Sequence, residues 1–247
     1  MKVTILNKPY NLKTEWQEIT LEDSVNLLAV ELPQSLKKCY DALLSKDKKA
    51  YQKECEKLTA NESIKEHPAF FGEVISLLSD IPKDIIDTVG WESRTEWYHN
   101  FFEKIYLDCY FGEPSSYKAE SLKSFTHKDV EYFFPESLKI FNKEIPMHKE
   151  SAVSFAEEAD IMASVLALDG IGIGGMAQVS AVMCREKGED YDEDKAISRA
   201  ENFKDLPMNI VWEVFFYIIK QCNISANLAL TSLRQLNEAK AAGLISE

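Results

Sequence analysis

The sequence lacks the features that mark disulfide-stabilised, secreted and membrane-spanning proteins. Its 5 cysteines are odd in number and widely spaced, with no CxxC pair, which argues against a disulfide framework and a zinc ribbon. No stretch approaches the roughly 18 uncharged apolar residues that a membrane span needs. The start, MKVTILNKPYNLK, contains no long apolar segment of the kind found in signal peptides. We therefore expect a protein of a reducing cytoplasm without a membrane partner.

Positive charge is also scarce. Lysine and arginine number 28 against 41 aspartates and glutamates, so the formal net charge is −13. Nucleic acids and anionic membranes are bound through cationic side chains, which makes an acidic chain a poor candidate for either partner. With 247 residues, 45% of them hydrophobic, the chain is long and apolar enough to bury a core. We expect a globular protein whose partners are other proteins, and the oligomeric state stays open.

Motifs of enzyme chemistry are absent or incomplete. There is no GxSxG, no cysteine lies in a recognisable nucleophile context, and the 4 histidines are distant from one another in sequence. The glycine-rich stretch 169–175 (DGIGIGG) follows an expected helix instead of a strand, and no Lys-Ser/Thr pair follows it, so neither phosphate-loop pattern is complete. We interpret its glycines as flexible or positive-φ backbone between packed elements. We expect no catalytic residue, cofactor or metal, and keep a nucleotide- or metal-binding enzyme that uses this loop as the alternative.

An acidic run at 186–194 invites comparison with calcium loops. Asp190, Asp192 and Asp194 alternate, and Glu201 falls at the twelfth place counted from Asp190. Lys195, however, stands at the sixth place, where the sharp turn of such a loop needs glycine. We favour the solvated N-terminus of a helix, where acidic groups interact well with the helix dipole.

Most of the chain has the spacing of amphipathic helices. Thr20 to Asp23 has the form of a capping box, and Pro33 ends the helix that it opens. The range 34–65 is highly charged, and we expect one or two exposed helices there, interrupted near 45–47, that project from the body. Further helices are expected at 68–78, 83–89, 151–168 and 225–242. The expected apolar face of the helix after Thr20 is Leu21, Val25, Leu28 and Leu32.

Two regions are expected to form the core. In the aromatic-rich stretch 91–111, a stripe at i, i+4 spacing predicts a buried helix, with a generic helical adaptor that displays this face as the alternative. In the C-terminal third, the apolar segments 176–184 and 207–219 flank a charged helix over 185–204 and should fold back on each other. The stripe in 91–111 is Trp97, Phe101, Ile105 and Cys109, with Phe102 beside it.

The remaining pattern is of short strands. Val3 and Ile5 alternate before the turn signal Asn7-Lys8-Pro9, which predicts an N-terminal hairpin. A lone hairpin is only marginally stable, so we expect it to pair with strands near 130–147. The predicted fold is mainly α with a small antiparallel β element (α+β), in a single domain over 1–247.

The order of segments resembles the tail-assembly chaperones and baseplate-hub assembly proteins of tailed bacteriophages. The segments are the hairpin, WQEITLEDSVNLL, FFGEVISLLSDIP, EYFFPESLKIFNKEIPMHKESAVSFAEEADI and AVMCREKGEDYDEDKAISRAENFKDLPMNIVWEVFFYII. The C-terminal features that carry the comparison are Glu189 to Asp192, Arg199 to Phe203, Leu206-Pro207 and Phe215-Phe216.

This resemblance implies a non-enzymatic protein that helps to build the virion or forms part of it. Its partners would be other virion or tail proteins, met in the host cytoplasm or in the particle. The N-terminal strand could join the edge of a partner's sheet. The residues that we expect to contact a partner are Val3, Ile5, Trp16, Tyr191 and Phe203.

Overall fold

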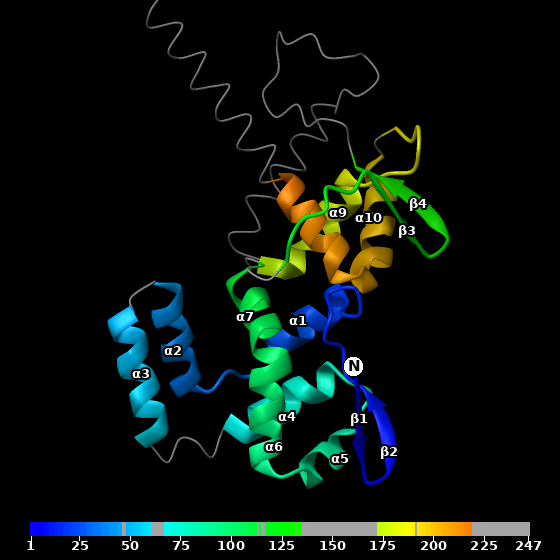
Figure 1. Cartoon of the computed structure of the whole chain (residues 1–247). Coiled ribbons are helices and arrows are strands. Elements are labelled where there is room, and N and C mark those ends of the chain that lie inside the picture. Colours follow the sequence, from blue (N-terminus) through cyan, green and yellow to red (C-terminus); the bar gives the residue numbers. More distant parts are fainter. Residues whose placement is uncertain are drawn as a thin grey trace, which may run out of the picture. The chain divides into compact units, whose positions relative to one another are not determined.

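The computed structural model divides the chain into two compact units (Figure 1). The structure describes residues 1–45, 48–60, 67–112, 114, 117–134, 172–190 and 192–218. Unit 1 contains Met1–Lys118, Ile171–Met176 and Lys204–Asn209, and unit 2 contains Ala119–Gly170, Ala177–Phe203 and Ile210–Glu247. The expectation of one domain over 1–247 stays a prediction, and the helices expected at 151–168 and 225–242 lie outside the described residues.

The α+β class is confirmed, since helices dominate both units and two small antiparallel sheets accompany them. No helix in the described part of the chain combines the length and the apolarity that crossing a bilayer requires. The helices of unit 1 are α1 (Leu21–Ala29), α2 (Gln34–Leu44), α3 (Lys48–Ala60), α4 (His67–Leu77), α5 (Lys83–Thr88), α6 (Trp91–Trp97), the π-helical turn η2 (Tyr98–Phe102), α7 (Glu103–Phe111) and the 3₁₀ turn η3 (Gly172–Gly175).

Helix α1 begins at the predicted capping box. The Thr20 hydroxyl accepts the Asp23 N–H at 3.1 Å, and the Asp23 carboxylate accepts the Thr20 N–H at 2.9 Å. Its predicted apolar face was wrong, because Ser24 is buried while Val25 and Leu28 are exposed. Ser24 tolerates burial because its hydroxyl donates to the Thr20 carbonyl oxygen at 3.3 Å.

Helices α2 and α3 pack side by side and are separated at 45–47, as predicted (Figure 1). Leu36, Cys39 and Tyr40 of α2 are buried, so α2 is anchored in unit 1. The hydroxyl groups of Tyr40 and Tyr98 lie 2.9 Å apart, and the Tyr98 ring stacks on Phe71 with a centroid distance of 4.3 Å. These buried side chains attach α2 to the rest of unit 1.

The aromatic-rich stretch is a helical rod made of α6, η2 and α7 (Figure 1), in which η2 and α7 contribute buried residues and α6 contributes none. A core role is confirmed for Ile105 and Cys109 of the predicted stripe. In its first half, however, the fully buried residues are Tyr98 and Phe102, whereas Trp97 and Phe101 are only half-buried.

The N-terminal hairpin consists of β1 (Lys2–Ile5) and β2 (Lys8–Asn11), which pair antiparallel. Its predicted pairing with strands near 130–147 was wrong in the part that the structure describes, because 130–133 belongs to a separate two-stranded sheet and 135–147 lies outside the described residues. The hairpin instead gains support from the segment that follows α4. An isolated bridge joins Leu12 to Ser79, and the Lys13 N–H donates to the Leu78 carbonyl oxygen at 2.8 Å.

The turn of this hairpin places a leucine in the left-handed region. Leu6 has φ 50° and Asn7 has φ 64°, as a two-residue type I′ turn requires, and Leu6 is 70% exposed. A bulky residue is strained there, so we expect Leu6→Asn to raise the free energy of unfolding by about 1 kcal/mol in urea denaturation. Leu6→Ala is the control, because it removes the exposed side chain and keeps a Cβ at positive φ. Equal stability of the two variants would contradict the strain.

Unit 2 packs helices against the second hairpin. Strands β3 (Ser124–His127) and β4 (Val130–Phe133) pair antiparallel, and the remaining helices are α9 (Met176–Met183), α10 (Glu193–Asn202) and a helix at 208–218 that continues from unit 1 into unit 2. Phe203, after α10, is fully buried against the rings of Phe125 and Tyr132. Most of the described residues in the predicted apolar segments before and after α10 are buried.

A buried carboxylate organises the loop that leads to β3. Glu213, on the helix at 208–218, is 3% exposed and accepts the N–H groups of Glu120 at 2.5 Å and Leu122 at 3.2 Å. Ser121 lies between these two donors with φ 59°. The acid therefore serves as an acceptor for backbone groups that the loop would otherwise leave unpaired.

Candidate functional site

A polar hollow of about 420 Å³ opens in unit 2 beside the turn that precedes α10. The turn is closed by the Glu189 N–H, which donates to the Glu186 carbonyl oxygen at 3.1 Å, and Gly188 supplies a φ of 75° that other residues adopt with strain. Side chains from β4, the turn and α10 line the hollow, among them Tyr132, Lys187, Glu189, Lys195, Ser198 and Arg199.

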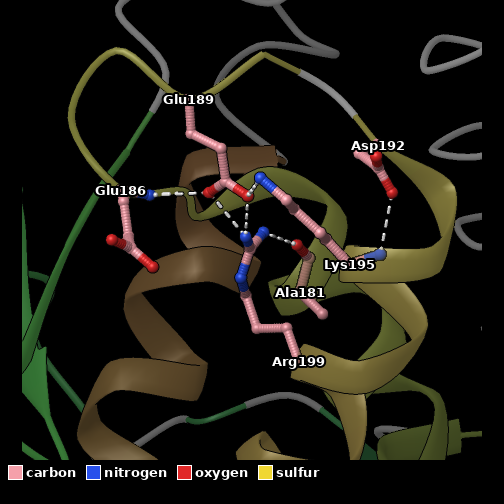
Figure 2. Close-up of polar contacts among 6 residues, drawn as sticks. All are labelled: Ala181, Glu186, Glu189, Asp192, Lys195 and Arg199. Atoms are coloured by element: carbon pink, nitrogen blue, oxygen red, sulfur yellow. Dashed lines mark hydrogen bonds and ion pairs between the residues drawn. The ribbon is translucent and has the colours of Figure 1, made fainter.

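Arg199 is the central cation of this hollow (Figure 2). Its side chain is 8% exposed, and its Nη2 donates to the two carboxylate oxygens of Glu189 at 2.6 and 2.5 Å. Its Nη1 donates to the Ala181 carbonyl oxygen near the end of α9 at 2.8 Å, and its guanidinium lies 5.7 Å from the centre of the Tyr132 ring. Arg199 thus ties α9, α10, the turn and β4 together.

The Glu189 carboxylate is also largely buried and has partners in addition to Arg199. Its carboxylate is 10% exposed and also accepts the Glu186 N–H at 3.0 Å, with the Lys195 ammonium at 3.7 Å (Figure 2). A guanidinium that is already paired with a carboxylate is a weak receptor for an anionic ligand, because its donors are in use. The geometry of this hollow therefore favours a structural ion pair over a catalytic or ligand-binding role.

The calcium-loop reading of the same region is contradicted by the helix. Asp192 caps α10 by accepting the Lys195 N–H at 3.0 Å, as expected for an acidic helix N-terminus. Glu201 lies near the other end of α10, roughly 13 Å away at the rise of about 1.5 Å per residue. Within the described ranges, no group of three or more histidines, cysteines or acids could hold a metal ion.

The glycine-rich stretch is described from Gly172 onward. There the chain forms η3, which packs against α1, so these glycines continue directly into helical backbone instead of a flexible loop. A Cβ added to Gly174 would lie 3.9 Å from Cγ2 of Val25, an ordinary contact distance. Residues 169–171 lie outside the described residues, so the nucleotide-binding alternative stays untested on them.

The described cysteine thiols are buried. Cys39, Cys109 and Cys184 are free cysteines, and burial raises the pKa of Cys109 and of Cys184 to about 12 from the ordinary value of 9.0. Only the thiolate is a strong nucleophile, so burial suppresses the reactivity of both groups.

This burial predicts slow chemical labelling. In a C39S/C55S/C222S background, which leaves Cys109 and Cys184 as the two thiols, both should react with DTNB at about pH 8 roughly a thousandfold more slowly than in denaturant, from ionisation alone. The measurement is absorbance of the released thiolate, with the denatured protein as the control. Fast labelling of both thiols in the native protein would contradict their burial.

The residues predicted to contact a partner fall into different environments. Val3 and Ile5 are half-buried on one face of the hairpin, whereas Trp16, 9% exposed, and Phe203, fully buried, are part of the core. Tyr191 lies outside the described residues. Partner binding by this set stays a prediction, which the burial of Trp16 and Phe203 does not favour.

The N-terminal strand, which the sequence suggested could join a partner's sheet, belongs to a hairpin whose two outer edges differ. Met1 and Leu12 exchange both backbone hydrogen bonds, at 2.8 and 2.7 Å. Because hydrogen-bonded and non-hydrogen-bonded pairs alternate in an antiparallel ladder, the pairs Lys2↔Asn11 and Thr4↔Pro9 are of the second kind. The backbone groups of these four residues therefore point away from the hairpin.

One of the two outer edges is closed. Along β2, Pro9 has no N–H, and Asn11 is occupied by Asp80, whose carboxylate accepts the Asn11 N–H at 2.7 Å and whose N–H donates to the Asn11 carbonyl oxygen at 3.1 Å. Along β1, Lys2 and Thr4 are exposed, and no described residue bonds to their outward backbone groups. The edge of β1 is thus open for pairing.

Of the hollow and the edge of β1, the edge is the one that offers backbone groups to which no described residue bonds. Comparisons of the chain with protein-family models, with curated proteins and with solved structures found no match.

Proposed function

We propose that this chain is a non-enzymatic bacteriophage protein that acts in tail or baseplate assembly, or as a component of the virion, through protein–protein contacts. The resemblance in segment order supports the phage context, and the open edge of β1 is the observation that carries the binding mode. Natural proteins protect such edges with bulges, prolines or covering elements, because unpaired N–H and C=O groups recruit other strands. Here Pro9 and Asp80 protect the edge of β2, whereas no described residue pairs with the edge of β1.

The charge of the chain fits the same role. At −13, it repels nucleic acid and anionic membranes and stays dispersed, as an assembly factor must before its partner is made. The buried ions of unit 2 are used to hold the fold, Arg199 by Glu189 and Glu213 by backbone N–H groups. These contacts favour a binding protein over a catalyst.

The test is co-expression with the tail and head genes that neighbour its own gene. A C-terminal tag leaves the hairpin free, and mass spectrometry of the purified complex identifies the partner. We expect a stable association with one virion protein. Analysis of purified particles then separates a chaperone, absent from them, from a structural component. No association with any virion protein would refute the proposal.

A ligand screen provides the independent control. If the hollow beside Glu189 or the glycine-rich stretch bound a nucleotide or metal, a ligand at about a hundred times its dissociation constant would stabilise the fold by about 2.7 kcal/mol. A proposal of pure protein contact requires a flat thermal-shift response across a panel of nucleotides and divalent cations.

A further inference from the structure

We propose that the outer edge of β1 is a docking site for an extended acidic segment of a partner protein, which adds to the hairpin as a third strand. The inference deepens the proposed function, on which it rests only for the origin of the partner. Strand addition supplies main-chain hydrogen bonds, and side chains beside the edge supply selectivity. The edge offers the outward N–H and C=O groups of Lys2 and Thr4.

The charge around this edge selects the partner. Residues 1–14 contain three lysines and no acid in a chain whose net charge is −13. Lys13 is neutralised by Asp23 at 2.7 Å, whereas Lys2 and Lys8 are exposed on the hairpin. Opposite charges on neighbouring strands attract and like charges repel, so an acidic strand is favoured over a basic one. Pairing with β1 of a second copy would bring two basic hairpins together and is disfavoured for the same reason.

The tip of the hairpin adds an apolar anchor. Leu6 is 70% exposed at a turn position where asparagine or glycine would be unstrained. Neither its exposure nor its backbone conformation is explained by packing within unit 1. Strain of this kind persists at sites of function, and a leucine side chain beside the open edge is suited to an apolar recess in a partner.

The second hairpin provides a comparison within the same chain. Thr126 occupies in β3 the place that Thr4 has in β1, two positions before the two-residue turn at Lys128 and Asp129. That hairpin carries Asp129 and Glu131 beside its basic side chains, so its charge is mixed. It therefore serves as a matched edge without the basic character on which the proposal depends.

The decisive variant is Thr4→Pro in the full chain. Proline removes the outward N–H of Thr4 and leaves the ladder bonds of the hairpin intact, because Thr4 belongs to a non-hydrogen-bonded pair, as Pro9 does. The probe is a short synthetic peptide that alternates valine with glutamate, and its counterpart has lysine for glutamate. We expect the wild-type chain to bind the glutamate peptide, with amide shifts at Lys2 and Thr4 in NMR spectra and weaker binding at high salt.

Thr4→Pro should weaken this binding about tenfold, whereas Thr4→Val and Thr126→Pro should leave it unchanged within about twofold. The double variant Lys2→Glu with Lys8→Glu should reverse the preference, so that the lysine peptide binds better than the glutamate peptide. If circular dichroism shows that Thr4→Pro does not fold, this double variant provides the test of the docking site. Equal binding by wild type and Thr4→Pro would overturn the docking site, as would loss of binding only in Thr126→Pro. A concentration-dependent dimer that Thr4→Pro abolishes, without peptide binding, would assign the edge to a second copy and also overturn the proposal.

Failure of this site is distinguishable from failure of the proposed function. If a virion protein co-purifies equally with wild type and Thr4→Pro, the docking site is wrong and the assembly role stands. If wild type binds the glutamate peptide and Thr4→Pro does not, while no virion protein co-purifies, the docking site stands and the phage role is wrong.

Discussion

Replacing Glu189 with alanine is expected to lower the free energy of unfolding by about 3–5 kcal/mol, because it strands the Arg199 guanidinium in a site where its side chain is 8% exposed. Among the described residues, Arg199 would retain the Ala181 carbonyl oxygen and the Tyr132 ring as partners. Urea denaturation followed by circular dichroism measures the loss.

Lys195→Ala is the matched control. Its ammonium lies 3.7 Å from the same Glu189 carboxylate, but its side chain is 62% exposed, so we expect a loss below about 1 kcal/mol. A second control removes both buried charges. Glu189→Leu with Arg199→Met should destabilise much less than Glu189→Ala, because no unpaired charge stays buried. Equal losses for Glu189→Ala and Lys195→Ala would show that burial does not strengthen this ion pair.

Local features of the fold could be predicted from the sequence because neighbouring residues determine them. The capping box at Thr20 and Asp23 needs only the backbone of its own helix turn, and the break at 45–47 separates two helices by local propensity. These two elements are found where the pattern placed them. The charged helix expected over 185–204 begins later, at Glu193, because Asp192 caps it after the turn that contains Gly188.

Contacts between distant segments could not be predicted in this way. The face of α1 was wrong because Ser24 is buried although it is polar, and α1 packs against α7, an element far along the chain. The pairing of the N-terminal hairpin was wrong because the segment after α4 offers Ser79 and Asp80 to β2. The periodicity of hydrophobic residues along the sequence does not identify which distant segments will be in contact.

The hollow of unit 2 was also not predicted, because it depends on a contact between separate segments. One residue of α10, Arg199, nevertheless indicates a buried ion pair. Arg199 lies on the face of α10 that also buries Ala196 and Ala200, and an arginine at an apolar position of a helix requires a buried partner. The acidic run that precedes the helix contains that partner, Glu189. The run as a whole has the pattern of a solvated helix terminus, and its spacing does not distinguish Glu189 from the other acids as the partner of the arginine.

The rod made of α6, η2 and α7 tests whether the spacing of apolar residues predicts which of them are buried. The predicted stripe placed Trp97, Phe101, Ile105 and Cys109 at constant four-residue spacing. In an α-helix each such step exceeds a full turn by about 40°, so the stripe drifts around the helix. The buried residues Tyr98, Phe102, Ile105 and Cys109 follow steps of four, three and four, which stay on one face.

We therefore expect Phe102→Ala to lower the free energy of unfolding by about 3–5 kcal/mol, since Phe102 is fully buried and its loss leaves a cavity. Phe101→Ala removes the same side chain from the next position, where it is half-buried, and should cost about 1 kcal/mol. Urea denaturation of the two variants compares residues of identical chemistry that differ only in the face they occupy. A larger loss for Phe101→Ala would restore the four-residue stripe and place the core on the other side of the rod.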